Sequence, residues 1–446
     1  MAPKTWMKVA GLLLAAVLLF AAGCSDDKAK EADKSGVAPG VDQAAPADGP
    51  AFDPQIPGAA PADSAQAGSP APGPDGLIHG VVKIGFNIPL TGDIPDVGES
   101  SRNAAEMLKA QINSVEGLEV GGKRYAVEFF YEDNESKAES ALAAARKLIT
   151  QDKVLAIVGP QSSKQAVPAG ETCNELKTPM VSPWSTNPAT TKDRPYVFRG
   201  CFLDPFQGPV AAKFVTEEFG AKKAAVLYDI ASDYPKGLAE VFKEAFEKIH
   251  GPGSVVAFET FTTKDVDFSA QLTNIVNSGA DVLFVPQYYN EVPLIVKQAK
   301  ALGWDKPIMG SDSWGSGDLM GLCMDDCKGF FFTTHYAAAG AQGATKEFID
   351  KYKAAYGKTP DDVAALTWDS TNLVLQAIRD AGQVEGDVAQ VRELIKNALG
   401  TTNNFAGITG NMSFTPEGDP AKCAVVVKID EQSGDFTFYK SACPDK

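Results

Sequence analysis

Two hydroxyl-rich segments of this chain each follow an apolar strand pattern, and both could bind the charged end of a small molecule. They are residues 159–163 and 179–188, and Pro183 and Pro188 of the second forbid continued sheet pairing. In open α/β sheets, small ligands bind at the carboxyl ends of strands. An ordinary polar turn is the alternative for either segment alone. The hydroxyls and the one large ring that they supply are Ser162, Ser163, Trp184, Ser185 and Thr186.

These residue types suit an α-amino acid. Its carboxylate needs hydroxyl and backbone N–H donors near a helix N-terminus, which Ser162 and Ser163 offer just before a helix predicted to begin near Gln165. Ser185 and Thr186 add further donors. Its ammonium group needs a carboxylate, and Asp312 follows a predicted strand at 307–309. Capping of a helix is the alternative role for Asp312.

Aromatic side chains in the predicted strand–helix loops could wall the apolar part of such a ligand. Trp304 and Trp368, by contrast, fit helix packing. The loop aromatics are Trp184, Tyr234, Tyr288, Tyr289 and Trp314.

Motifs for other chemistries fail. Residues 117–123 have the spacing of a phosphate loop, but Arg124 follows and the segment leads into a strand, so a hairpin turn is expected. Nucleophilic catalysis would have to recruit His79, His250 or His335, and only His335 could approach a cleft. We therefore expect no catalytic residue, no cofactor and no metal.

From residue 81 onward, β-rich apolar runs alternate with helical patterns, which predicts parallel sheets covered on both faces. The expected strands are residues 82–86, 127–131, 154–158, 224–228, 255–258 and 281–285. The helices between them include residues 138–149, 206–219, 237–249 and 293–302. Later helices at 345–356, 361–381 and 387–399 precede strands at 411–414, 423–429 and 436–439. This order predicts two α/β lobes, with several chain crossings between them and a ligand cleft where they meet.

The N-terminus predicts export. Lys4 and Lys8 precede an uncharged run at 9–22 that meets Gly23 and Cys24, as in a bacterial lipoprotein signal at residues 1–23. Ala21 departs from the usual Leu of that signal, which leaves ordinary secretion open. Residues 24–78, rich in Ala, Pro and Gly, predict a disordered tether.

Composition narrows the partners and the redox setting. A net charge of −16 without a basic stripe argues against nucleic acid. Besides Cys24 there are six cysteines, an even number that favours disulfides over metal or redox use in an oxidising compartment. Local loop closure predicts the pairs Cys173–Cys201, Cys323–Cys327 and Cys423–Cys443.

The order and spacing of several fragments resemble the periplasmic Leu/Ile/Val-binding protein family, over about residues 81–439. Those fragments are Pro89-Leu90-Thr91-Gly92, Ile157-Val158-Gly159 with Ser162-Ser163, residues 182–188, Arg199, Asp204-Pro205-Phe206-Gln207-Gly208, Asp229 with residues 233–237, Asp267-Phe268-Ser269, and residues 410–419. The family consists of substrate-binding subunits of branched-chain amino acid ABC transporters. The resemblance implies a type I periplasmic-binding-protein fold.

By position, the resemblance implies that Ser163 and Thr186 hold a ligand carboxylate, with backbone contacts from Ser185. Asp312 stands where the family places the acid for the ammonium group, and Tyr234 and Tyr288 would close over the ligand from the second lobe. Trp184 occupies a position where family members usually have a small residue. The aromatic residue that some members carry near Val97 is absent from this chain. The ligand's side chain therefore stays open.

The resemblance also implies a domain plan and partners. Lobe 1 would comprise residues 79–203 and 335–409, lobe 2 residues 204–334 and 410–446, with hinge crossings near 203–204, 334–335 and 408–410. We expect a monomer in the periplasm, lipid-anchored through Cys24, that delivers an amino acid to a membrane permease. The alternatives are a ligand-sensing receptor component, or transport of an amide, an aromatic acid or another small metabolite.

Overall fold

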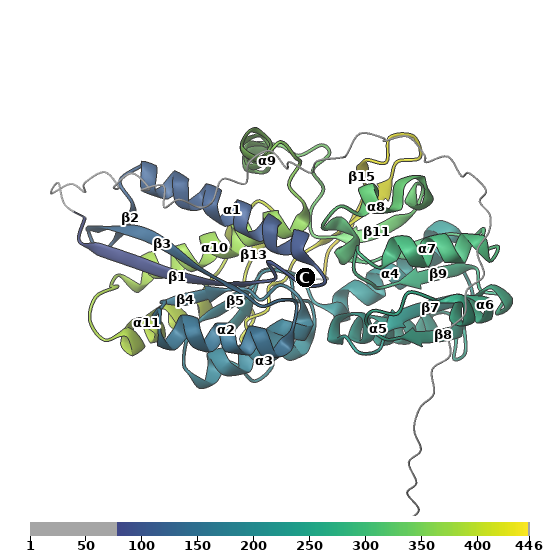
Figure 1. The fold of residues 1–446 in the computed structure, drawn as a ribbon, viewed down its shortest axis with the longest axis horizontal. Coiled ribbons are helices and arrows are strands. Elements are labelled where there is room, and N and C mark those ends of the chain that lie inside the picture. The colour runs from purple at the N-terminus through teal and green to yellow at the C-terminus, as the bar shows by residue number, and fades with distance from the viewer. Residues whose placement is uncertain (1–77, 445–446) are drawn as a thin grey trace, which may run out of the picture. The chain divides into compact units, whose positions relative to one another are not determined.

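The computed structural model describes residues 78–444 of the chain (Figure 1). The predicted signal segment 1–23, Cys24 and almost all of the predicted tether lie outside the described residues. Within the described part, no helix is both long and apolar enough to cross a bilayer.

The first of two large sheets contains the early strands of the chain. Its order is β2–β3–β1–β4–β5–β6, and every pairing is parallel except the β2–β3 hairpin at the predicted turn. The strands are β1 (Gly80–Ile88), β2 (Leu118–Val120), β3 (Lys123–Asp133), β4 (Ala156–Val158), β5 (Met180–Ser182) and β6 (Val197–Arg199). Strand order reverses at β1, between β3 and β4, which makes the carboxyl ends of β1 and β4 a switch point.

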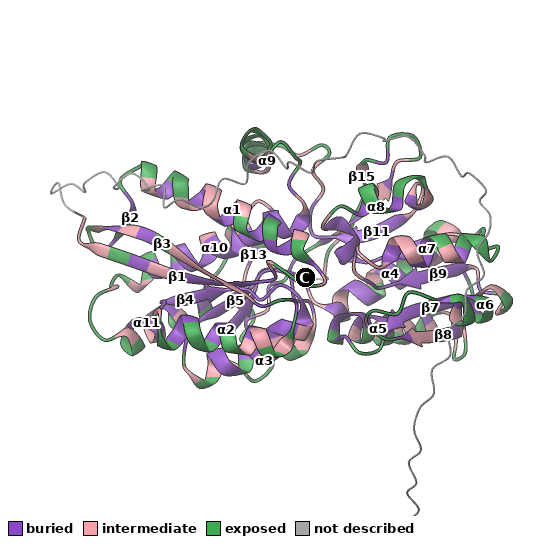
Figure 2. Ribbon diagram, viewed as in Figure 1, coloured by how far each residue is buried: buried purple, intermediate pink, exposed green. Residues whose placement is uncertain are grey.

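Helices cover both faces of this sheet (Figure 1). One face packs on α1 (Pro95–Ser114), α10 (Asp362–Ala381) and α11 (Val388–Gly400), and the other on α2 (Ala138–Thr150) and α3 (Ser163–Glu175). All three residues of β4 are consequently buried, which explains its uninterrupted apolar sequence (Figure 2). The helix α9 (Gly343–Tyr356) packs against α1 and α10.

The second sheet has the order β15–β14–β11–β10–β9–β7–β8. Its strands are β7 (Ala224–Asp229), β8 (Val255–Phe261), β9 (Val282–Val285), β10 (Ile308–Gly310), β11 (Phe331–Thr334), β14 (Ala424–Ile429) and β15 (Phe436–Ala442). The β11–β14 and β14–β15 pairings are antiparallel, and the other pairings of this sheet are parallel. One face packs on α4 (Asp204–Phe219) and α5 (Asp233–His250), and the other on α6 (Ser269–Asn277), α7 (Val292–Ala301) and α8 (Leu319–Cys323). The predicted parallel α/β architecture is thus confirmed.

Three connections link the elements of the two sheets. The first runs from β6 to α4 and the second from β11 to α9, close to the predicted crossings. The third lies later than predicted. After the short hairpin of β12 (Phe405–Gly407) and β13 (Gly410–Met412), Phe414 still packs on Phe198 of the first sheet. The chain reaches the second sheet only at β14.

Hydrogen bonds to buried side chains fix the first and third connections. Lys422 is 3% exposed, and its Nζ donates to the carbonyl oxygen of Gly200 at 2.9 Å. The Asp369 carboxylate accepts the amides of Ile408 and Thr409 at 2.8 and 2.9 Å. Lys422 therefore joins the third connection to the first, and Asp369 of α10 holds the turn between β12 and β13.

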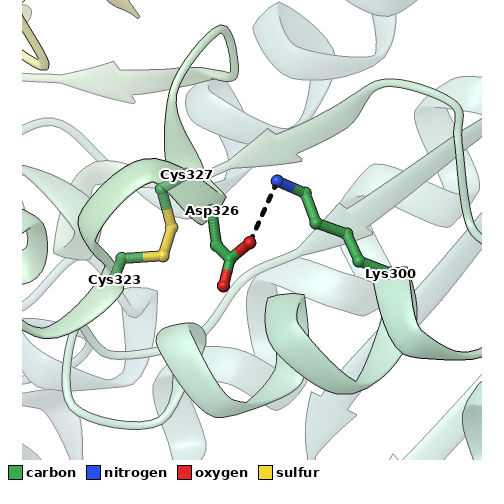
Figure 3. The surroundings of a disulfide bond; sticks show 4 residues. All are labelled: Lys300, Cys323, Asp326 and Cys327. Carbon is green, nitrogen blue, oxygen red and sulfur yellow. Dashed lines mark hydrogen bonds and ion pairs between the residues drawn. A yellow bond between two sulfur atoms is a disulfide. The ribbon is translucent and has the colours of Figure 1, made fainter.

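The cysteines follow the predicted pairing only in part. The structure joins Cys323 to Cys327 and Cys423 to Cys443, with Cα–Cα distances of 5.7 and 4.0 Å. The first disulfide closes the turn after α8, where Asp326 points toward Lys300 of α7 at 3.4 Å (Figure 3).

The predicted Cys173–Cys201 disulfide is wrong, because both residues are buried free thiols. Cys173 lies on α3 within the apolar layer between α2, α3 and the first sheet. Cys201 lies in the first connection, where its thiol faces the Ser185 carbonyl oxygen at 3.2 Å. Closeness in sequence did not reveal that the two side chains lie in different apolar clusters.

A thiol count distinguishes the two pairings. In a Cys24→Ser variant unfolded in denaturant without reductant, we expect two reactive thiols per chain, from Cys173 and Cys201, and none before unfolding, because both are buried. A colorimetric thiol assay measures this. A count of zero in denaturant would restore the predicted third disulfide.

Candidate functional site

A narrow, partly open cavity lies where the carboxyl ends of strands from both sheets face each other. The space between its walls is about 150 Å³ including the part open to solvent, and none of it is wide enough for a water molecule; we call it the inner cavity. Six of the eight predicted ligand-binding residues line it: Ser162, Ser163, Trp184, Tyr234, Tyr288 and Asp312. The first three follow β4 and β5, and the others follow β7, β9 and β10. The two sheets therefore supply opposite walls of one site.

The first-sheet wall is a helix N-terminus with hydroxyls. Ser162 is the N-cap residue of α3, its hydroxyl donates to the Gln165 Oε1, and Ser163 is the first residue of the helix, so amides of the first turn lie beside both hydroxyls. The Ser185 hydroxyl donates to the Ser163 Oγ at 2.9 Å and contacts the Thr190 Oγ1 at 2.6 Å. Donors at the positive end of a helix dipole favour an anion.

A buried arginine positions the loop that carries Ser185. Arg199 has no exposed surface, and its guanidinium donates to the Ser185 carbonyl oxygen at 2.6 Å and to the Asn187 carbonyl oxygen at 3.0 Å. It also donates to the Thr191 Oγ1 at 2.7 Å and forms an ion pair with Asp419 at 2.6 Å. The loop after β5 is thus held by several hydrogen bonds from one buried guanidinium group.

The second-sheet wall centres on the Asp312 carboxylate, which is 1% exposed. Its Oδ1 accepts the Tyr234 hydroxyl at 2.5 Å and the Gln207 Nε2 at 2.8 Å. Its Oδ2 faces the His335 Nε2 at 3.2 Å. Burial lowers the pKa of His335, so the ring is neutral at pH 7 and can donate its Nε2 proton to Asp312. The His335 Nδ1 has no hydrogen-bond partner among the described residues, as suits the unprotonated nitrogen.

Three aromatic rings complete the walls. Tyr288 lies between Trp184 and Tyr234, with ring centroids 5.9 and 5.3 Å away. The Trp184 indole is 3% exposed, and its Nε1 donates to the Asp362 carboxyl at 3.4 Å. Burial, reinforced by the charges of Asp361 and Asp312, raises the pKa of Asp362 well above its usual range. Trp184, at a position where the sequence resemblance leads us to expect a small residue, thus forms part of the cavity wall.

Other predicted residues lie elsewhere. Ser185 contacts the cavity residue Ser163 but does not itself line the inner cavity. Thr186 is fully buried outside it, and its carbonyl oxygen accepts the Asp204 amide at 2.9 Å. Tyr289 and Trp314, predicted as ligand walls, belong to the apolar core under the second sheet. The Trp314 ring lies over Gly310, where a Cβ would meet ring carbons at 2.2 Å.

Sequence reasoning missed two donors to Asp312. Gln207 lies in one of the fragments that resemble the Leu/Ile/Val-binding family, but no role was predicted for it. Its Nε2 donates both to Asp312 and to the Thr333 Oγ1, the latter at 2.6 Å. His335 was considered only as a catalytic group. Its hydrogen-bond partner within residues 78–444 is Asp312, and no Cys, Ser or Lys of that range bonds to it. In the same range, no group of His, Cys, Asp and Glu is arranged to hold a metal ion.

Asp204 is a second buried carboxyl beside this wall. It is the first residue of α4, is fully buried, and has neither oxygen in hydrogen-bond geometry with the described residues. Burial raises the pKa of Asp204 to about 8, although the nearby Thr186 hydroxyl and Arg199 favour its charged form. At neutral pH the folded protein holds a proton on Asp204 that the unfolded chain releases.

A cavity between the facing strand ends of two sheets, which the chain links three times, defines a two-lobed solute-binding protein. The chain belongs to the periplasmic binding protein family, whose model matches residues 81–435.

Individual proteins agree with this assignment. A leucine-, isoleucine-, valine-, threonine- and alanine-binding protein of Pseudomonas aeruginosa is 29% identical over 343 residues, covering 76% of this chain and 87% of the relative. A leucine-binding protein from Thermotoga maritima has a similar structure, with a TM-score of 0.74, 33% identity, and coverage of 82% of this chain and 99% of that one. A branched-chain amino acid transporter substrate-binding protein from Streptococcus pneumoniae, solved with isoleucine, has a TM-score of 0.73 and 32% identity. The match covers 82% of this chain and 100% of that one. The predicted type I periplasmic-binding-protein fold is confirmed.

Replacing Asp204 tests its buried protonated state. Because the pKa is raised on folding, Asp204 makes stability fall as pH rises from about 4 to about 8. An Asp204→Asn variant lacks this loss, so its free energy of unfolding should gain on that of the natural protein by roughly 1 kcal/mol per pH unit in that window. Urea denaturation at pH 5, 6, 7 and 8 measures the difference. A constant difference across these pH values would contradict a raised pKa.

Proposed function

We propose that the protein is the extracytoplasmic solute-binding component of an ABC transporter, which captures an amino acid by closure of two lobes and delivers it to the membrane permease. The observation that carries the proposal is the inner cavity, with a helix N-terminus and hydroxyls on one wall and a buried carboxylate on the other. An amino acid has the two charges that match these walls. This subunit would make or break no bond, and ATP hydrolysis would belong to its partners.

The ligand carboxylate would lie at the start of α3. Ser163 and Ser162 offer hydroxyls there, and the first-turn amides offer further donors. Ser185 would act by holding the Ser163 side chain in place, since their hydroxyls are hydrogen-bonded. Thr186 lies deeper, and a direct contact from its side chain would require local rearrangement on binding.

The ligand ammonium group would bind Asp312. An ionised carboxylate has about four acceptor positions, and Tyr234, Gln207 and His335 occupy three of them. One position is left for the ligand. A charge-assisted hydrogen bond in a site that excludes water is stronger than one in solvent.

Binding would shift a population toward the closed form. The carboxylate and the ammonium group contact elements of different sheets, so only the closed arrangement satisfies both at once. The lobes would turn about the three connections, and the permease would recognise the closed form.

The cellular setting follows from the family and the N-terminal sequence. We place the protein outside the cytoplasm, as a monomer anchored by a lipid on Cys24 after removal of residues 1–23. The oxidising compartment would keep the Cys323–Cys327 and Cys423–Cys443 pairs oxidised.

An Asp312→Asn variant tests the ammonium contact. The tightest-binding amino acid should first be found by a thermal-shift screen, since a ligand of the folded state raises its apparent stability. Loss of the buried charge should weaken its binding by about 100-fold or more, measured by calorimetric titration. Asp350→Asn, at an exposed position on α9, is the matched control and should bind normally. Normal affinity of the Asp312 variant would exclude the proposed contact.

A Cys24→Ser variant tests the lipid anchor. The natural protein should sediment with membranes, and the variant should be recovered in the soluble extracytoplasmic fraction because it lacks the acylated thiol. Immunoblots of the two fractions measure this. Membrane association that survives the substitution would rule out anchoring through Cys24.

A further inference from the structure

A second cavity adjoins the inner cavity and shares Ser162 and Tyr288 with it. We call it the outer chamber; it is partly open to solvent, and the space in it that water can occupy is about 30 Å³. Both sheets contribute to its walls. Lys164 is the second residue of α3, Asp229 ends β7, and Glu291 directly precedes α7. A molecule in the inner cavity could therefore extend past Ser162 and Tyr288 into the outer chamber.

The outer chamber has an excess of negative charge. Of the described residues that line it, Asp93, Asp229 and Glu291 are acidic and Lys164 alone is basic. Burial above all, together with the charges of Asp229 and Asp93, raises the pKa of Glu291 to about 7, although Lys164 opposes them. The neighbouring acidic residues therefore disfavour the charged form of Glu291, and a bound cation would favour it.

Unsatisfied polar atoms face the same space. The Ser232 hydroxyl, the Tyr288 hydroxyl and the Asn290 Oδ1 are buried and have no hydrogen-bond partner within the described part of the chain. Ser232 as a whole is only 4% exposed. The Tyr288 hydroxyl lies near those of Ser162 and Ser232 but outside hydrogen-bond geometry. Buried polar groups normally have partners, so a ligand with several N–H groups could bond to these side chains.

The occupant is neither a bare metal ion nor an apolar group. Residues 78–444 contain no cluster of three acidic, His or Cys side chains close enough to coordinate a metal. Ile94 is the single aliphatic residue among the described residues that line the chamber. Separated carboxylates and acceptor oxygens suit a larger organic cation, whose several N–H groups can reach more than one of them.

We propose that the ligand is an amino acid with a second positive charge, an ammonium or guanidinium group at the end of its side chain, and that this group binds in the outer chamber. The proposal rests on the proposed function, because it takes the α-carboxylate and α-ammonium groups to lie in the inner cavity. Glu291, Asp229 and Asp93 determine the specificity, and the unpartnered oxygens of Ser232, Tyr288 and Asn290 accept the remaining N–H groups.

Calorimetric titration with L-lysine and L-norleucine tests the proposal. The two ligands share the α-groups and the length of the carbon chain, and only lysine carries the terminal ammonium. We expect lysine to bind at least about tenfold more tightly than norleucine. In a Glu291→Gln variant the ratio should fall several-fold, whereas in Glu244→Gln, an exposed change on α5, it should not. Asp93→Asn, in the half-exposed loop before α1, serves the same purpose if the Glu291 variant does not fold.

The outcomes separate this proposal from the proposed function. Binding of norleucine or L-leucine as tightly as lysine would overturn the cationic chamber and leave amino-acid binding intact. An unchanged lysine-to-norleucine ratio in folded Glu291→Gln and Asp93→Asn variants would also overturn it. Failure of every amino acid to bind would overturn both proposals.

Discussion

The site depends on one buried carboxylate, that of Asp312. Removing such a charge from water costs several kcal/mol unless donors surround it, and here the donors come from α4, α5 and the end of β11. Gln207, Tyr234 and His335 must therefore keep fixed positions relative to β10. This constraint orders the carboxyl edge of the second sheet before any ligand arrives.

The first sheet meets this edge with groups of opposite character. The start of α3 and its serine hydroxyls favour an anion, and Arg199 fixes the neighbouring loop through two carbonyl oxygens. Each wall is preorganised by its own hydrogen bonds and keeps few free positions for a ligand. A zwitterion could satisfy both walls simultaneously, which would couple ligand capture to closure.

Sequence patterns predicted the alternating α/β architecture because strands covered on both faces, such as Ala156–Val158, must be apolar throughout. They also predicted the inner cavity, since parallel strands place the residues that follow them at one edge. The direction of a loop side chain is not encoded in that periodicity, so Trp314 was predicted at the site although it packs over Gly310. The contacts of Gln207 and His335 with Asp312 were not predicted. These residues lie 105 and 23 positions from Asp312 along the chain, and local sequence patterns do not show such distant contacts. The Cys173–Cys201 disulfide was wrongly predicted because sequence spacing does not show which apolar cluster a side chain enters.

The central claim is that both charges of an amino acid are bound at once, one by each sheet. The most direct measurement is a calorimetric comparison of the tightest-binding amino acid with its N-acetyl derivative and its carboxamide. The account predicts that each derivative loses at least about 100-fold in affinity, because each removes one charged contact. A derivative that binds as tightly as the parent amino acid would contradict it.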